Sequence, residues 1–132
     1  MSVKHRILFV DDEPFVLSAL SRLLRRDYDV VTAPGGGEGL AAIRQGPPFA
    51  AVVSDLRMPE MDGMTFLEEV RQLAPDTARI LLSGLSDEAG AVEAVREGRI
   101  FQILMKPASR EELLQALSAA VEGRGQNGTG RE

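Results

Sequence analysis

The sequence predicts an α/β fold in which a five-stranded, doubly wound parallel sheet carries five helices. Three observations support this prediction. Short apolar runs alternate five times with stretches of helical periodicity, each strand coming before its helix. The apolar runs lack polar alternation, which is typical of parallel strands buried on both faces. The chain has 132 residues, too few for a barrel of eight strand–helix units.

The five predicted strands are short, and each leads into a helical stretch. They cover residues 7–10, 30–31, 50–53, 80–82 and 100–105. Right-handed crossovers between parallel neighbours leave few topologies open. We expect the order 2-1-3-4-5, the flavodoxin-like arrangement, with the second strand at one edge of the sheet.

The predicted helices follow from apolar residues spaced i, i+4, i+7 and i+8. They cover residues 16–24, 66–74 and 113–121, with shorter helices near residues 38–44 and 87–97. Ser109 and Glu112 have the spacing of a capping box, and Asp87 is expected to cap its helix. Residues 35–39 are rich in glycine but lack the pattern of a phosphate-binding loop, so we expect a flexible connection there.

The composition restricts the chemistry that is available. There is no cysteine and His5 is the single histidine, which excludes thiol nucleophiles, zinc–thiolate sites and multi-histidine metal sites. The net charge of −5 argues against a nucleic-acid-binding face. No apolar run approaches the roughly 20 residues of a membrane span, and the first residues lack a signal-peptide core. We therefore expect a cytoplasmic protein that binds neither nucleic acid nor membrane directly.

The chain is expected to hold one domain, over residues 1–122, because its length suits a single core. Residues 123–132 are glycine-rich and polar, with no apolar residue to bury. Such a composition is typical of a flexible tail or the start of a linker.

Polar residues follow four of the five predicted strands. The first strand leads into Asp11 and Asp12, the third into Asp55, the fourth into Ser83 and the fifth into Lys106. In open parallel sheets, ligands bind beyond the carboxyl ends of the strands. Each residue alone has an ordinary explanation: Asp12, for example, could cap the helix that follows it. Four such groups at one edge of the sheet favour a functional site.

Three carboxylates that converge on one crevice repel each other, so either some of them are protonated or a cation shares the site. Carboxylate oxygens without histidine or cysteine suit Mg²⁺, with Mn²⁺ as an alternative. The ammonium group of Lys106 and the hydroxyl of Ser83 complete a set that can hold a transferring phosphoryl group. A carboxylate can itself be the nucleophile and form an aspartyl phosphate.

The same residues carry a family resemblance. Over about residues 6–121 the chain resembles the receiver domain of two-component response regulators, of the chemotaxis-regulator type. The matching motifs are Phe9-Val10-Asp11-Asp12-Glu13-Pro14, then Asp55-Leu56-Arg57-Met58-Pro59-Glu60-Met61-Asp62-Gly63, then Leu82-Ser83-Gly84, and finally Lys106-Pro107. The second motif is highly specific by itself.

The resemblance implies a role for each acidic residue. Asp55 would be the phosphoacceptor, which takes a phosphoryl group from the phosphohistidine of a histidine kinase or phosphotransfer protein. Asp12 and Asp55 would bind Mg²⁺ directly, together with the backbone carbonyl of Arg57. Asp11 would act mainly through a metal-bound water. Such a domain is a signalling phosphoacceptor rather than an enzyme, and it catalyses only its own phosphorylation and dephosphorylation.

The resemblance also implies roles for residues of the last two motifs. Ser83 would turn towards the phosphoryl group and Lys106 would pair with its oxygens. Gly84 would leave room for the incoming group, and Pro107 would follow a cis peptide bond. The face formed by the fourth helix, fifth strand and fifth helix would then switch between two packings. A downstream output or a second copy of the chain, in a phosphorylation-dependent homodimer, would detect the change.

Two features depart from the family pattern. Ile103 stands where receivers often carry the aromatic residue that moves with the serine. Phe101 comes two residues earlier, so strand alternation places it on the same face as Ile103. Arg57 and Leu85 occupy positions that influence the lifetime of the phosphoryl group in the family, in a direction that the sequence leaves open.

Two other functions remain as alternatives. One is a Mg²⁺-dependent phosphatase or phosphotransferase that uses Asp55 on a small substrate, although position 57 is arginine rather than a second acid. The other is a degenerate receiver that serves only as an interaction module. The complete set of acidic pair, acceptor, hydroxyl and lysine argues against the second. The output is open: the chain would either act alone or be one domain of a longer regulator.

Overall fold

One parallel sheet of five strands organises the protein. The computed structural model describes residues 4–84 and 89–123, and within them the strand order is β2-β1-β3-β4-β5. The predicted fold class and strand order are therefore confirmed. The strands are β1 (Arg6–Val10), β2 (Asp29–Ala33), β3 (Ala51–Asp55), β4 (Ala78–Ser83) and β5 (Gln102–Met105).

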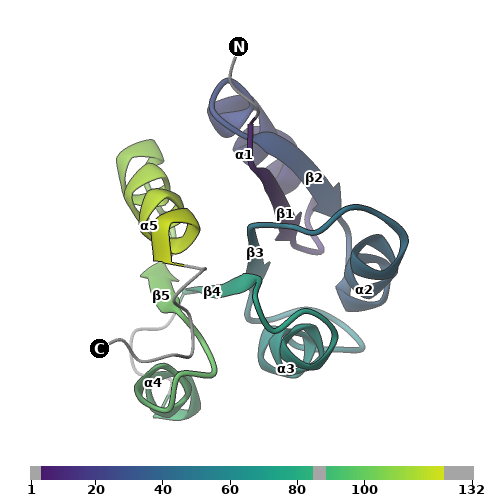
Figure 1. Cartoon of the computed structure of the whole chain (residues 1–132), viewed down its shortest axis with the longest axis vertical. Coiled ribbons are helices and arrows are strands. Elements are labelled where there is room, and N and C mark those ends of the chain that lie inside the picture. Colours follow the sequence, from purple (N-terminus) through teal and green to yellow (C-terminus); the bar gives the residue numbers. More distant parts are fainter. Residues whose placement is uncertain (1–3, 85–88, 124–132) are drawn as a thin grey trace.

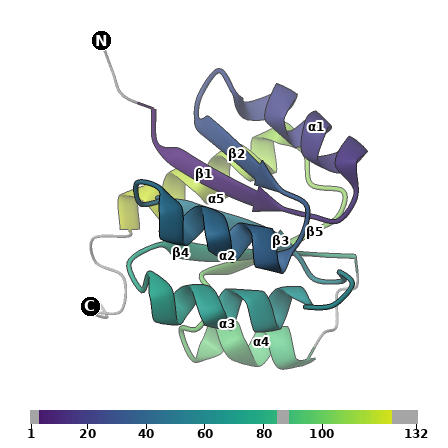
Figure 2. The ribbon, with the colours of Figure 1, turned by 90° about the vertical axis from the view of Figure 1, so that its right-hand side faces the viewer.

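Helices cover both faces of the sheet (Figures 1 and 2). α1 and α5 lie against one face, and α2, α3 and α4 lie against the other. Their bounds are α1 (Pro14–Leu24), α2 (Gly36–Gln45), α3 (Gly63–Leu73), α4 (Ala89–Arg96) and α5 (Arg110–Gly123). Within the residues that the structure describes, no helix is long and apolar enough to cross a membrane.

The sheet separates two apolar layers. Along β1, Ile7 and Phe9 pack with α1 and α5, whereas Leu8 and Val10 pack with α2, α3 and α4. Every residue of β3 and β4 is buried. Because both faces of these strands are covered, their sequences are almost continuously apolar, and this is the pattern that predicted them.

The glycine-rich segment is ordered helix rather than the flexible connection that the sequence predicted. α2 begins at Gly36, and Gly35 is its extended N-cap. A methyl group on Gly39 would lie 2.9 Å from the ring of Phe66 in α3 and 3.1 Å from the Val10 side chain. Small residues are therefore needed here because α2 packs closely on its neighbours.

Side chains fix two of the helix starts. Ser109 and Glu112 form the predicted capping box, in which each backbone N–H donates to the side chain of the other, at 2.9 and 3.0 Å. The Asp62 carboxylate accepts from the Thr65 N–H at 2.8 Å and caps α3. Asp87 lies outside the described residues, so its predicted capping role stays a prediction.

The end of the chain is described as far as Gly123, the last residue of α5. The predicted tail therefore overlaps the helix by one residue, and the rest of it lies outside the described residues. The division into a domain over residues 1–122 and a tail stays a prediction.

Candidate functional site at the carboxyl ends of the strands

The candidate site lies where four strands end. Asp55 and Ser83 are the last residues of β3 and β4, and Asp11 and Lys106 directly follow β1 and β5. The backbone ties these ends together: the Lys106 N–H donates to the Ser83 carbonyl at 2.8 Å. Since parallel strands end at one edge of the sheet, the structure brings all four residues to the same place.

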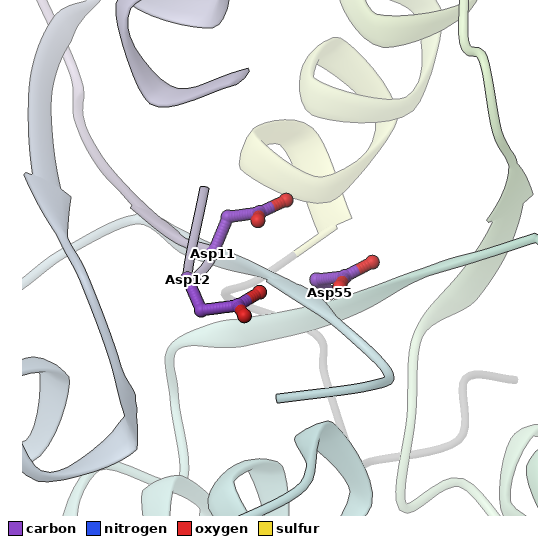
Figure 3. A group of neighbouring side chains, drawn as sticks. All are labelled: Asp11, Asp12 and Asp55. Carbon is purple, nitrogen blue, oxygen red and sulfur yellow. The ribbon is translucent and has the colours of Figure 1, made fainter. Parts of the chain in front are cut away.

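Three carboxylates form a cluster at this edge. Asp11, Asp12 and Asp55 each offer one oxygen, and these oxygens lie within 4.8 Å of one another. Figure 3 shows the side chains of Asp11 and Asp12 extending towards Asp55 from the segment after β1. Asp11 and Asp55 are 2% and 7% exposed, whereas Asp12 is open to solvent. One side of the cluster therefore remains accessible.

Asp12 does not cap α1. The N-cap of this helix is Glu13, whose side chain makes no capping hydrogen bond. Instead, the Glu13 N–H donates to Asp11 Oδ1 at 2.9 Å. The ordinary explanation of Asp12 as a helix cap is therefore wrong, and its exposed carboxylate points into the cluster.

Lys106 supplies a cation to the cluster. Its Nζ donates to Asp55 Oδ1 at 2.8 Å and lies 3.9 Å from Asp11 Oδ2. Partial burial acts to lower the pKa of Lys106, but the hydrogen bond and charge of Asp55, with the charge of Asp11, outweigh burial and raise it. Lys106 is thus held in its charged form beside two acids.

Asp11 has a carboxylate oxygen that lacks a hydrogen bond. Its Oδ2 is buried and has no hydrogen-bond partner. Burial is the main cause that raises the pKa of Asp11 above the ordinary value of 3.8, and the charges of Asp55 and Asp12 add to it. A buried oxygen without a hydrogen-bond partner, next to two more carboxylates, fits a hard divalent cation. The three acids could hold Mg²⁺ here.

This cost of burial leads to a prediction for the metal-free protein. Because the folded pKa of Asp11 is raised, its contribution to stability is complete below pH 3.8 and is lost as pH rises through the folded pKa. At neutral pH the charged Asp11 thus opposes folding. In a chelator, Asp11→Asn should raise the melting temperature by about 3–6 °C, equivalent to roughly 1 kcal/mol.

Asp12→Asn is the control for this prediction, because the exposed Asp12 has little burial to relieve. Its melting temperature should change by less, in line with surface substitutions of about 0.5 kcal/mol or below. Thermal melts in a chelator between acidic and neutral pH make the comparison. If Asp11→Asn is no more stable than wild type at neutral pH, the charged carboxylate is not opposing folding.

The remaining predicted site residues are near the same edge. Ser83 is fully buried, and among the residues that the structure describes none has an atom within 4 Å of a methyl group placed on the exposed Gly84. Arg57 is exposed in the loop after β3. The peptide bond between Lys106 and Pro107 is cis. Leu85 lies outside the described residues.

The prediction that Phe101 shares a face with Ile103 is wrong. Phe101 packs against the α1–α5 layer, whereas Ile103 packs against the layer of α2, α3 and α4. Alternation fails because β5 begins at Gln102, so Phe101 belongs to the segment before the strand. Phe101 therefore does not stand in for an aromatic residue at position 103.

Two residues that hold Asp55 were not singled out from the sequence. The Ser54 hydroxyl donates to the Asp55 carbonyl at 2.9 Å. Gly63, the first residue of α3, approaches the same carbonyl so closely that a methyl group would overlap it. A hydroxyl residue inside an apolar strand could have drawn attention to Ser54. Gly63 stands out in the sequence only as the last residue of the motif that begins at Asp55.

Comparisons with known proteins agree with this fold and arrangement. Residues 7–118 match the family described as Response regulator receiver domain. The chain is 39% identical over 117 residues to the transcriptional regulatory protein GlrR of Escherichia coli, which covers 88% of this chain and 26% of the relative. It is 34% identical over 122 residues to the hydrogenase transcriptional regulatory protein HoxA of Bradyrhizobium diazoefficiens, covering 92% of this chain and 25% of the relative.

A solved structure is similar over almost the whole length. The response regulator receiver domain protein from Clostridium thermocellum superposes with a TM-score of 0.85 at 31% identity, covering 92% of this chain and 98% of that one. The chain therefore belongs to the family of response regulator receiver domains of two-component signalling. It spans about a quarter of the length of the first curated relatives that it matches.

Proposed function

We propose that this receiver domain accepts a phosphoryl group on Asp55 in the presence of Mg²⁺. The observation that carries the proposal is the position of the Asp55 carboxylate: Lys106 Nζ lies 2.8 Å from one of its oxygens, and it forms a cluster with Asp11 and Asp12. A carboxylate next to a fixed cation, with two more acids that could hold a metal ion beside it, is suited to a reaction that adds negative charge at one oxygen.

The donor would be the phosphohistidine of a kinase or phosphotransfer protein. A carboxylate oxygen of Asp55 attacks the phosphorus, a P–O bond forms, and the P–N bond to the donor imidazole breaks. The imidazole nitrogen keeps the electrons of that bond and takes a proton from solvent. Asp12, Asp55 and the carbonyl of Arg57 would hold Mg²⁺ directly and Asp11 would hold it mainly through a water, and the ion would supply positive charge beside the phosphoryl oxygens.

The residues around Asp55 would serve the phosphoryl group in distinct ways. Lys106 shifts its hydrogen bond from the carboxylate to a phosphoryl oxygen. Ser83 offers its hydroxyl to another oxygen, and the open space at Gly84 admits the group. In the separate hydrolysis reaction, water attacks the phosphorus, the P–O bond to Asp55 breaks and inorganic phosphate leaves, which restores the Asp55 carboxylate. These two reactions are the only ones we assign to the domain.

The response would pass to the face of α4, β5 and α5. Val92 on α4 and Met105 on β5 are large apolar side chains that are 43% and 44% exposed. Ile103 of β5 is partly buried against the α4 side, where a shift in Ser83 could be accommodated by repacking. A downstream output or a second copy of the chain would bind one packing better than the other. The cytoplasmic location stays a prediction.

The test is to incubate the protein with acetyl phosphate and Mg²⁺ and to record its intact mass. Acetyl phosphate replaces the kinase, and acetate is then the leaving group. We expect an adduct with the mass of one phosphoryl group, which peptide mapping locates at Asp55. A chelator should prevent it. An adduct at another residue, or none in excess donor and Mg²⁺, would overturn the proposal, and turnover of a generic phosphomonoester would favour an enzyme instead.

A further inference from the structure

The first turn of α2 contacts the loop that follows the candidate phosphoacceptor. Gly36 is buried, and a methyl group on it would lie 2.6 Å from Met61 Sδ, 3.2 Å from Met61 Cγ and 3.3 Å from Met61 Cβ. Met61 belongs to the loop between β3 and α3 and is partly buried in the apolar layer of α2, α3 and α4. The Met61 side chain therefore rests on the backbone of α2 in a space that only glycine leaves free.

The chain just after Met61 contacts the backbone at Asp55 and Leu56. Two residues after Met61, the Gly63 N–H donates to the Leu56 carbonyl at 2.8 Å. Gly63 also packs directly on the Asp55 carbonyl. Between them, Asp62 is fixed by its hydrogen bond to the Thr65 N–H. Met61 is therefore connected to the backbone of Asp55 through the two residues that follow it.

The turn before Met61 needs contacts with other parts of the chain to hold its conformation. Glu60 has a φ of 71°, and it is the only non-glycine residue with a positive φ in the described part of the chain. This conformation is unfavourable for a residue with a side chain, so neighbouring contacts must hold it. Met61, the next residue, provides such a contact through its packing on Gly36.

We propose that Met61, held on Gly36, is a positioning residue for Asp55. The proposal rests on the function proposed above, since it concerns the carboxylate that would accept the phosphoryl group. The contact sets the distance between Asp55 and the two acids after β1 by pressing the start of α3 on the end of β3. The contact also explains why glycine is needed at the start of α2, since a flexible connection there would not require it.

Gly36→Ala tests this proposal, and Gly37→Ala is its matched control. Both changes place alanine in the first turn of α2, but a methyl group on Gly37 has no atom within 4 Å. The readouts are the rate of phosphorylation by acetyl phosphate as Mg²⁺ is varied, and the melting temperature. For Gly36→Ala we expect a rate roughly 10-fold lower and a higher Mg²⁺ concentration at half-maximal rate. Gly37→Ala should match wild type.

A double variant separates positioning from general destabilisation. Met61→Ala alone should also lower the rate, because the turn loses its contact. In the Met61→Ala background, Gly36→Ala has no sulfur to displace and should cause no further loss. A merely structural role would change the melting temperature while leaving the rate and its Mg²⁺ dependence as in wild type. That result, or losses that multiply in the double variant, would overturn the proposal.

Two further comparisons keep the test decisive. If Gly36→Ala does not fold, Met61→Ala is compared with Met64→Ala, since Met64 is a partly buried methionine of the same apolar layer but lies in α3. Equal rates in these two variants overturn the inference. If wild type itself forms no adduct at Asp55, the proposed function fails. If wild type forms the adduct and Gly36→Ala reacts identically, only the positioning inference fails.

Discussion

Asp55→Ala should abolish the phosphoryl adduct that acetyl phosphate and Mg²⁺ form on wild type. Asp55 is the acid in contact with Lys106, and the substitution removes the attacking oxygen itself, so no slower version of the same reaction remains. The adduct should fall below detection by intact mass under conditions that fully modify wild type. Asp11 and Asp12 do not replace it, because neither takes over the 2.8 Å contact with Lys106.

Asp76→Ala is a suitable control for the loss of one carboxylate. Asp76 is exposed in the segment before β4 and has the same net-charge effect when removed. It should leave the adduct unchanged. An adduct that survives Asp55→Ala at wild-type yield would show that another residue is the acceptor.

Lys106→Met should slow phosphorylation while strengthening the binding of Mg²⁺. Lys106 Nζ donates to the Asp55 carboxylate at 2.8 Å, and removing one such donor from a site of developing charge costs roughly 100-fold in rate. The same ammonium group competes with a metal for Asp55 and Asp11. Its loss leaves three carboxylates without their fixed cation, so their affinity for Mg²⁺ should rise roughly 3- to 10-fold.

The opposite signs make this prediction specific. Titration calorimetry with Mg²⁺ and adduct formation followed by mass measure the two effects separately. Lys4→Met is the matched control, because Lys4 is the other lysine of the sequence and donates to the carbonyl of Arg25 instead. A fall in Mg²⁺ affinity together with the rate would mean that Lys106 supports the site structurally rather than as a competing cation.

The fold could be predicted because the strands at the centre of its sheet are covered by helices on both faces. β3 and β4 are buried along their whole length, so their sequences carry a clear signal. β5 is harder to delimit, because the apolar run that contains it starts two residues before the strand. Because of that difference, Phe101 was predicted to lie on the wrong face of the sheet. The face of the sheet on which a side chain lies changes with a shift of one residue, so it can be predicted only if the first residue of the strand is known.

The convergence of polar groups could also be predicted, because topology alone brings the ends of parallel strands together. Asp55 and Lys106 are 51 residues apart in sequence and in hydrogen-bond contact in the fold. The contact between Gly36 and Met61 could not be predicted in this way. It depends on how closely α2 approaches the loop before α3, which is determined by side-chain packing and not by the period of either segment. The chemical roles of the site residues remain predictions that the experiments above test.

The separation of the two apolar layers affects how the sequence can diverge. Some substitutions would leave a void beside α1 and α5. Side chains from the opposite layer cannot fill such a void, since the closely packed strands lie between the two layers. Compensating changes must then arise in the same layer. A lineage can therefore remodel the side of α4 for a new partner while the side of α1 and α5 keeps its sequence. Along β1, Ile7 and Phe9 would then vary together with the layer of α1 and α5, and Leu8 and Val10 with the layer of α2, α3 and α4.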